Sequence, residues 1–163
     1  TDTLAHLANV GGSTHVLDVC CGLGGPARYL AHHYGSRVTG IDLNQSRVDG
    51  AARLTKMVGL EGKVSFYHAN ALSSALPGAE FDSLIAQEAF CHIPNKPGLL
   101  TECVRVLKPG GLIAFTDILE GTSMTTPVRE RLRREMAFME LNTLDSYRTL
   151  LETTGCEIKM TED

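Results

Sequence analysis

The chain of 163 residues contains no tryptophan, and aromatic residues make up only 6% of it. No apolar run in it approaches the roughly 20 residues that a membrane-spanning helix needs, and no stretch has the pattern of a signal peptide. Basic residues are not in excess, because 15 Lys and Arg stand against 19 Asp and Glu for a net charge of −4. These absences argue against membrane and nucleic-acid partners and favour a small-molecule substrate.

The cysteines lack the CxxC spacing of a zinc or redox site, and their number is odd: Cys20, Cys21, Cys91, Cys103 and Cys156. Both features argue against a disulfide framework and against a bound metal. We therefore expect reduced thiols and a cytoplasmic protein. Cys20 and Cys21 border a glycine-rich turn, and we interpret them as small buried apolar residues. A redox or nucleophilic role is the alternative.

The chain is organised around the stretch from Val16 to Ala31. It begins with an apolar run that predicts a buried strand. Gly22 and Gly24 then predict a turn where the backbone can approach a ligand closely, and Pro26 suits the first turn of a helix. A strand, a glycine-rich turn and a helix N-terminus present unpaired N–H groups and a positive dipole end to a ligand. The stretch therefore predicts a cofactor site.

Two kinds of cofactor fit this turn. Gly22-x-Gly24-x-x-Ala27 matches the relaxed fingerprint of a nicotinamide or flavin site. Asp18 favours a cationic ligand, and S-adenosylmethionine carries an ammonium and a sulfonium where a dinucleotide carries two phosphates. The stretch resembles the first motif of the class I S-adenosylmethionine-dependent methyltransferases, in which an acidic residue precedes alternating glycines. Cys20 occupies the first of those glycine positions, and the resemblance places it among the cofactor contacts.

Further cofactor contacts are expected after the next two strands. Asp42 ends an expected strand about 20 residues beyond the glycine turn, the spacing at which an acid binds ribose hydroxyls. The resemblance adds Leu43 beside it. After the strand at 64–68, the family commonly has an acid that accepts the adenine amino proton. Here the position holds Asn70, followed by Ala71. The Asn70 amide can still accept that proton, or Asn70 is an ordinary turn residue.

The segment Gln87 to Lys96 follows an expected strand at 81–86, at the edge where doubly wound sheets bind ligands. It resembles a stretch of small-molecule N-methyltransferases, among them the sarcosine and dimethylglycine methyltransferases. This implies that Gln87 contacts the methionine part of the cofactor and that Glu88 faces the acceptor. His92 is the candidate catalytic base or acceptor-positioning residue. Helix-start roles for Gln87 and Glu88, and a backbone hydrogen bond for His92, are the alternatives.

A helical insertion at about 119–142 interrupts the alternation of strands and helices. Pro127 begins a helix in which the apolar residues fall on one stripe: Val128, Leu132, Met136 and Met139. The resemblance implies that such an insertion covers the substrate. One of its arginines is a candidate clamp for a substrate carboxylate, with a solvated charged face as the alternative.

Together these motifs predict a Rossmann-like α/β fold, a doubly wound and mostly parallel sheet with helices on both faces, without the final antiparallel strand of the family. The expected strands are 16–19, 37–42, 64–68, 81–86, 112–118 and 156–160, and the main expected helices are 47–58, 99–107 and 144–154. Residues 1–163 are expected to form a single S-adenosylmethionine-binding methyltransferase domain, as a fragment of a longer chain.

The resemblance implies S-adenosyl-L-methionine as cofactor and S-adenosyl-L-homocysteine as product. The expected acceptor is the nitrogen of a small amine, as in sarcosine or dimethylglycine. Three alternatives stay open: O- or C-methylation of a small molecule such as a quinone precursor, a nicotinamide-dependent oxidoreductase, and a non-catalytic binding module. The oligomeric state is not indicated.

Overall fold

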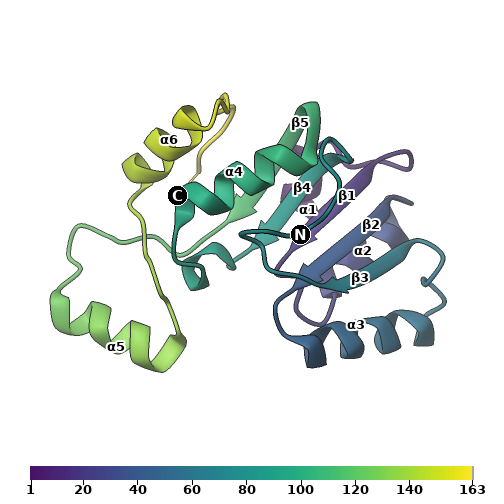
Figure 1. The fold of residues 1–163 in the computed structure, drawn as a ribbon, viewed down its shortest axis with the longest axis horizontal. Helices are drawn as coiled ribbons and strands as arrows, with labels where there is room; N and C mark the ends of the chain where they lie inside the picture. The colour runs from purple at the N-terminus through teal and green to yellow at the C-terminus, as the bar shows by residue number, and fades with distance from the viewer. Residues whose placement is uncertain (163) are drawn as a thin grey trace.

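The computed structural model, which describes residues 1–162, contains a five-stranded sheet with the order β3-β2-β1-β4-β5 (Figure 1). All neighbouring strands are parallel. The chain reverses its direction of travel across the sheet after β3, so that β1 and β4 lie side by side at its centre. This arrangement confirms the predicted doubly wound α/β fold and places the ligand-binding edge at the carboxyl ends of the strands.

Helices separate most of the strands along the chain, except that β4 follows β3 without a helix between them. The strands are β1 His15–Val19, β2 Arg37–Asp42, β3 Val64–His68, β4 Phe81–Gln87 and β5 Leu107–Thr116. The helices are α1 Asp2–Leu7, α2 Gly25–His33, α3 Gln45–Met57, the single 3₁₀ turn η1 Phe90–His92, α4 Lys96–Val106, α5 Thr126–Met136 and α6 Leu144–Thr153. None of the helices in the described part of the chain is long and apolar enough to cross a membrane.

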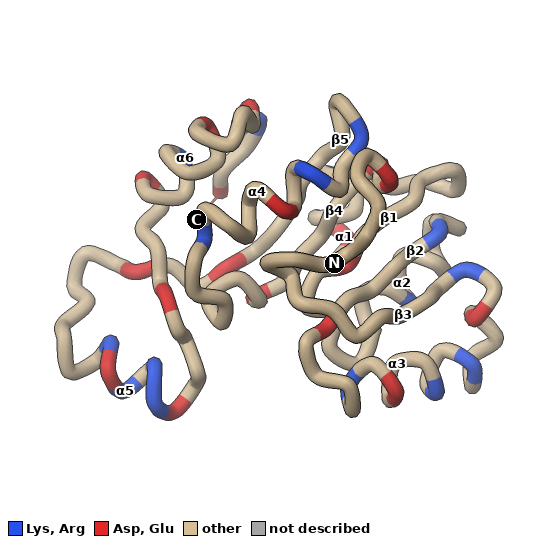
Figure 2. Tube along the Cα trace, in the orientation of Figure 1, with Lys and Arg blue, Asp and Glu red and all other residues tan. Residues whose placement is uncertain are grey.

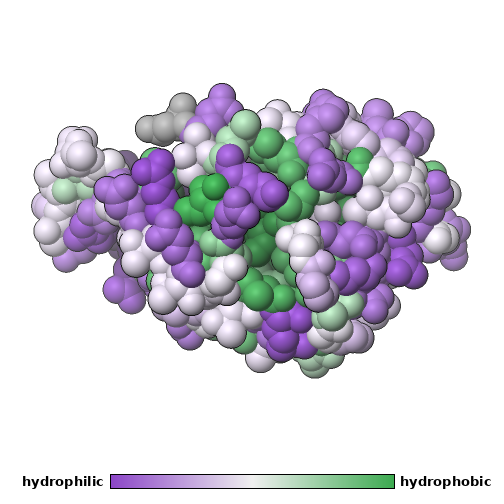
Figure 3. All heavy atoms as spheres, turned by 90° about the horizontal axis from the view of Figure 1, so that it is seen from above, coloured by the Kyte–Doolittle hydropathy of each residue, from purple (hydrophilic) through white to green (hydrophobic). Residues whose placement is uncertain are grey.

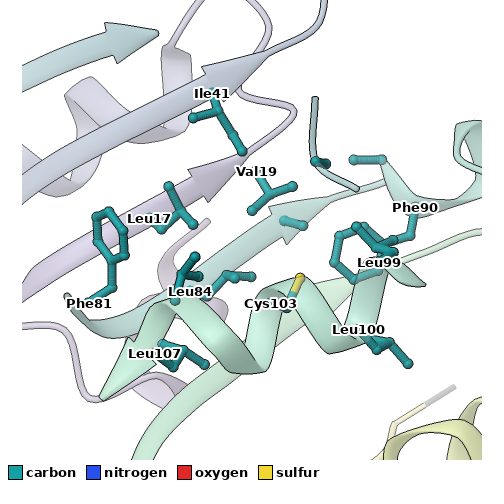
Figure 4. Packing of buried hydrophobic residues seen from close by; sticks show 14 of the residues in the cluster. Leu17, Val19, Ile41, Phe81, Leu84, Phe90, Leu99, Leu100, Cys103 and Leu107 are labelled. Atoms are coloured by element: carbon teal, nitrogen blue, oxygen red, sulfur yellow. The ribbon is translucent and has the colours of Figure 1, made fainter. Parts of the chain in front are cut away.

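Each face of the sheet carries its own hydrophobic core. On one face Leu17 and Leu84 pack against Leu99 and Cys103 of α4 (Figure 4), and Tyr147 of α6 joins the same cluster. On the other face α1 and α2 cover the sheet with small and aliphatic side chains: Leu4, Ala5, Ala27, Leu30 and Ala31. Because β1 is buried along its whole length, its run of apolar residues is that of a strand covered on both faces.

Hydrophobic and hydrophilic residues occupy different parts of the molecular surface. Viewed from above, hydrophobic residues gather in the middle of the face that includes α4, and hydrophilic residues lie to either side (Figure 3). Leu72 and Leu76, from the connection between β3 and β4, are partly buried against the core on this side of the sheet.

Phe66 of β3 fixes how closely β2 and the glycine turn approach each other. A Cβ atom at Gly40 would lie 2.6 Å from Phe66 Cδ1, and one at Gly24 would lie 2.4 Å from Phe66 Cζ. Both distances are far below van der Waals contact, so only glycine lets the aromatic ring occupy this place. The ring therefore couples the packing of β3 to the position of the glycine turn.

The predicted strand at 112–118 is wrong in its bounds. β5 begins at Leu107, which pairs with Phe81, and it ends at Thr116. The register shifts between Phe81 and Ser83, so that the Pro-Gly-Gly sequence lies inside the strand as an irregularity instead of before it. Gly110, with a φ of +78°, supplies the left-handed residue that this irregularity requires.

The predicted strand at 156–160 does not form. The segment alternates as a strand does, with Cys156 and Ile158 half-buried between exposed residues, but it pairs with no strand in the described part of the chain. A strand exists only where a neighbour completes its backbone hydrogen bonds. Side-chain alternation alone therefore predicted a strand that the structure does not contain.

We expect the substitution Gly40→Ala to lower the free energy of unfolding by about 2 kcal/mol, because the new methyl group overpacks the Phe66 ring. Chemical denaturation measures this change. Gly62→Ala is the matched control, since nothing lies within 4 Å of a Cβ atom at that glycine. The double variant Gly40→Ala/Phe66→Leu should recover part of the loss. A Gly40→Ala protein as stable as the wild type would show that the ring does not lie against Gly40.

Candidate active site

The glycine turn between β1 and α2 is built from left-handed residues. Gly22 and Gly24 have φ values of +55° and +74°, and the Gly24 N–H donates to the Cys21 carbonyl at 2.8 Å. Gly24 also precedes α2 as its N-cap, and a proline stands in the first turn of that helix. The turn thus leads directly into a helix N-terminus, where unpaired N–H groups favour an electron-rich ligand group.

Cys20, the residue that replaces a glycine of the family pattern, is left-handed as well, with a φ of +59°. This conformation costs a residue with a side chain about 1 kcal/mol or more, so the family preference for glycine here has a backbone cause. Burial raises the pKa of the Cys20 thiol to about 12 and also raises that of Cys21. Protonated thiols are poor nucleophiles, which supports their interpretation as small apolar residues.

Asp18 lies beneath the turn with only 2% of its surface exposed. Burial raises the pKa of its carboxyl group to about 7, although the backbone N–H of Ala27 opposes this shift and stabilises the ionised form. Its Oδ2 atom is buried and has no hydrogen-bond partner among the described residues. An unsatisfied carboxylate oxygen at this place suits a cationic ligand group, as the sequence predicted, because such a group supplies the missing partner.

Asp42, at the end of β2, holds the glycine turn. Its Oδ2 accepts a hydrogen bond from the Gly22 N–H and its Oδ1 accepts one from the Asn44 N–H, both at 2.9 Å. Asn44 in turn caps α3 by accepting from the N–H of Ser46 and Arg47. Asp42 therefore joins the turn, β2 and α3. Each carboxylate oxygen can accept a second hydrogen bond, so the expected ribose contact stays a prediction.

The expected adenine end lies at the carboxyl ends of β2 and β3. Leu43 is 67% exposed, and Ala71 is buried at 9%. Asn70 is exposed, and its Oδ1 accepts from the Leu72 N–H at 2.9 Å. Asn70 is thus a turn-forming residue in this structure, and its amide oxygen keeps a second lone pair for a ligand. The His68 ring donates from Nε2 to the Leu43 carbonyl, 2.9 Å away, which is a structural role.

The carboxyl end of β4 brings the acceptor-side candidates together. Gln87 ends the strand, and its Oε1 accepts from the Thr1 hydroxyl at 2.6 Å. Glu88 is exposed and left-handed, with a φ of +48°. Neither residue starts a helix, because η1 begins only at Phe90. The alternative that they serve as a helix start is therefore wrong, while their expected ligand contacts stay predictions.

His92 is exposed at the end of η1. Its Nδ1 lies 3.0 Å from the Ala137 carbonyl oxygen, and its ring lies 5.3 Å from that of Phe138. Since a carbonyl oxygen only accepts, Nδ1 carries the proton in the neutral ring and Nε2 keeps its lone pair. The backbone hydrogen bond is thus present, and it leaves Nε2 able to accept a proton.

Lys96 was not singled out by the sequence, and the structure shows it completely buried. Its Nζ donates to the carbonyls of Ile93 at 2.7 Å and Glu140 at 2.9 Å, and burial lowers its pKa. The Cys91 carbonyl also accepts from the N–H of Met139 at 2.9 Å. These bonds fix residues 137–140 to the segment after β4. Sequence could not reveal the bonds to Glu140 and Met139, because each joins parts of the chain more than 40 residues apart.

Asp117 and Tyr147 complete this attachment. Asp117, just past β5, accepts from the Cys91 N–H at 2.9 Å and from the Tyr147 hydroxyl. Tyr147 is 3% exposed, and burial together with the Asp117 carboxylate raises its pKa. Neither residue was predicted as part of the site. Through them α6 is anchored to the carboxyl ends of β4 and β5.

The insertion differs from its expected form. α5 has no buried residue, and it stands apart from the sheet in Figure 1. It ends at Met136 because Ala137 is left-handed, with a φ of +54°, so the prediction that Met139 belongs to its apolar stripe is wrong. Val128 and Met136 are exposed at 47% and 53%. The apolar stripe therefore exists in part, and no described residue buries it.

Comparison with known proteins decides the family. The model of the family described as "Methyltransferase domain" matches residues 17–115, which include the glycine turn, the ends of β2 and β3, and the segment after β4. The chain belongs to this methyltransferase family. With the fold, this confirms the predicted class I S-adenosylmethionine-dependent methyltransferase and its cofactor, and it favours them over a nicotinamide-dependent oxidoreductase.

The relatives differ in their reactions. The sterol 24-C-methyltransferase of Eremothecium gossypii is 34% identical over 98% of this chain and 44% of its own. The structure of the [4+2]-cyclase SpnF matches with a TM-score of 0.88 and 28% identity, over 99% of this chain and 57% of that one. A putative sarcosine dimethylglycine methyltransferase from Galdieria sulphuraria matches with a TM-score of 0.86 and 24% identity, over 94% and 58%. The chain spans about half the length of the curated relatives it matches.

We expect Asp18 to lower the stability of the ligand-free protein progressively as the pH rises from 4 to 7. Over this range the unfolded chain releases the Asp18 proton, whereas the folded protein keeps it up to a pKa of about 7. Each pH unit then costs up to about 1.4 kcal/mol.

Asp18→Asn removes this contribution, so its free energy of unfolding should fall less between pH 4 and 7 than that of the wild type. Urea denaturation at several pH values measures the difference. Asp49→Asn, at an exposed position of α3, should keep the wild-type pH dependence. Parallel curves for the wild type and Asp18→Asn would show that Asp18 titrates normally.

Proposed function

We propose that this chain is the catalytic domain of an S-adenosylmethionine-dependent methyltransferase that methylates a carbon atom of an uncharged small molecule. The observation that carries the cofactor assignment is the Asp18 carboxyl group, buried beneath the glycine turn with one oxygen unsatisfied. A cofactor whose amino-acid end carries an ammonium group provides the partner that this oxygen lacks. A pyrophosphate would instead be repelled by the ionised form.

The expected cofactor residues each contact a different part of the cofactor. Asp18 receives the ammonium group, and the backbone of Cys20, Gly22 and Gly24 lies against the amino-acid and ribose portions. Asp42 accepts from the ribose hydroxyls. The remaining expected contacts are Leu43, Asn70 and Ala71 at the adenine end and Gln87 at the methionine end. When bound, the cofactor supplies an electrophilic methyl group on a good leaving group, so the protein has mainly to align the acceptor.

The charges of α5 give little support to a clamp for an acidic acceptor. Figure 2 shows basic and acidic residues mixed along this helix. Three of its four arginines form ion pairs: Arg129 with Glu120, and both Arg131 and Arg134 with Glu135. Lys96 is already used by two backbone carbonyls. An uncharged acceptor needs none of these cations, whereas an amino acid or a phosphate ester needs at least one.

The relatives favour carbon over nitrogen as the methylated atom. Sterol 24-C-methyltransferases from several fungi are among the curated proteins similar to this chain, and their names specify methylation at carbon. The expectation of N-methylation rests on the segment from Gln87 to Lys96, and the sarcosine dimethylglycine methyltransferase structure, below 25% identity, supports the fold alone.

His92 is suited to remove the proton that the acceptor loses after methylation. Its Nδ1–H is oriented by the Ala137 carbonyl, which leaves the Nε2 lone pair at the exposed end of η1. A histidine base of this kind typically contributes a factor of about 10² to 10⁴ to the rate. The Phe138 ring next to it adds an apolar surface at the same place.

We expect S-adenosylhomocysteine to bind this chain and to lose at least tenfold in affinity in Asp18→Asn and Asp42→Ala, as measured by calorimetric titration. Wild-type affinity should also fall by up to tenfold for each pH unit below about 7, because protonated Asp18 cannot pair with the ammonium group. Asp49→Ala should bind like the wild type. Nicotinamide dinucleotides should not bind. Unchanged affinity in Asp18→Asn would contradict its assigned role.

We expect the full-length protein that carries this domain to transfer labelled methyl groups to uncharged apolar molecules with a reactive carbon, and not to sarcosine, dimethylglycine or phosphoethanolamine. His92→Asn should lower kcat by about 10² or more while cofactor affinity stays unchanged. Asparagine is the matched substitution because its amide can still donate to the Ala137 carbonyl. Transfer to amines alone would refute the carbon assignment, and cofactor binding without turnover on any acceptor would favour a non-catalytic domain.

A further inference from the structure

The connection between β3 and β4 has no regular secondary structure between residues 74 and 77, yet it lies over the hydrophobic core. Leu17, Val19, Ile41 and Leu84 of the sheet line a void beneath it of about 10 Å³, room for one water molecule at most. Within the connection Ser74 is only 7% exposed, although its neighbours Ser73 and Ala75 are exposed. An irregular segment that stays in place over a core needs specific anchors.

Glu102 and Arg105, one turn apart on α4, provide those anchors. Glu102 Oε1 accepts from the Ser74 N–H at 2.8 Å and from the Ser74 hydroxyl. The Arg105 guanidinium donates to both oxygens of Glu102 at 2.7 Å and to the Leu76 carbonyl at 2.8 Å. The Glu102 side chain is 13% exposed. The hydrogen bonds from Arg105 and from Ser74 lower the pKa of Glu102 to about 2. Glu102 therefore stays charged throughout the neutral range. We call Glu102, Arg105 and Ser74 the α4 anchor.

Ser74, the residue that the α4 anchor holds, lies two residues after the expected adenine-binding turn at residues 70–72. The Asn70 side chain accepts from the Leu72 N–H, and the Asn70 carbonyl accepts from the Ser73 N–H at 3.0 Å. Residues 70–72 are therefore held on one side by the end of β3 and on the other by Ser74. Ala71 and Leu72 pack on the core between these two points. The turn cannot shift without breaking a bond of Glu102 or leaving the core.

We propose that Glu102 and Arg105 are positioning residues for the adenine end of the cofactor, holding residues 70–72 in place from α4. This inference rests on the proposed function, because it assumes that residues 70–72 contact adenine. Neither side chain is among the expected cofactor contacts. Both act through Ser74, whose backbone N–H and hydroxyl transmit the position of α4 to the turn.

The test compares two ligands that differ only in the adenine base. S-adenosylhomocysteine and S-ribosylhomocysteine share the ribose and the amino-acid end, so only the first uses residues 70–72. We expect Glu102→Ala to weaken S-adenosylhomocysteine about tenfold in calorimetric titration and to change the affinity for S-ribosylhomocysteine less than twofold. Glu102→Gln, which keeps an acceptor for the Ser74 N–H, should restore most of the loss.

Asp145→Ala is the matched control, because it removes an acid paired with an arginine three residues ahead on α6 and leaves residues 70–76 untouched. Amide hydrogen exchange at Leu72 and Ser74 gives a second measurement, which should show faster exchange in Glu102→Ala than in Asp145→Ala. Equal weakening of both ligands, or unchanged affinity and exchange in Glu102→Ala, would overturn the inference. A wild-type chain that binds neither ligand would overturn the proposed function and this inference with it.

Discussion

The two hydrogen bonds that Asp42 accepts hold the ligand-binding edge together. One comes from the glycine turn and the other from the start of α3, so a single carboxylate joins the ends of β1 and β2. The Phe66 ring reinforces the same junction by filling the space beside Gly24 and Gly40. Because these contacts lie between parallel neighbours, the turn cannot open without separating β1 from β2. The protein's own contacts therefore hold the glycine turn in place.

Asp18, in contrast to Asp42, lowers the stability of the ligand-free protein. Its burial without a full set of partners raises its pKa, so near neutral pH the group contributes less stability than an ordinary exposed aspartate would. Such a cost is typical of functional sites, where a protein keeps a destabilising group that a ligand will satisfy. Asp42 and Asp18 thus divide the work at one edge of the sheet, since the first organises the backbone and the second remains available for a ligand.

The local sequence pattern was sufficient to predict most of the elements that form the ligand-binding edge of the sheet. The bounds of β2 and β3 were predicted to the residue, since each has a clear apolar pattern bounded by turn signals. The error at β5 arose because Pro-Gly-Gly normally breaks a strand, whereas pairing with β4 overrode that local preference. The burial of Lys96 could not be predicted from the sequence for a different reason. A lysine before a proline reads as an exposed helix start, and only residues 137–140, brought over it by the fold, make it buried.

The glycine turn and α5 are held in the structure in different ways. The glycine turn, Asp18 and Asp42 belong to the compact sheet, whereas α5 buries nothing and is attached mainly through residues 137–140. Changes in α5 can therefore alter the surface beside residues 137–140 without disturbing the glycine turn, Asp18 or Asp42. This agrees with a fold whose relatives are named for sterol C-methylation and for [4+2] cyclisation at similar identity. His92, Lys96 and the Cys91 carbonyl together join residues 137–140 to the segment after β4, so the position of α5 depends on the same segment that carries the acceptor-side candidates.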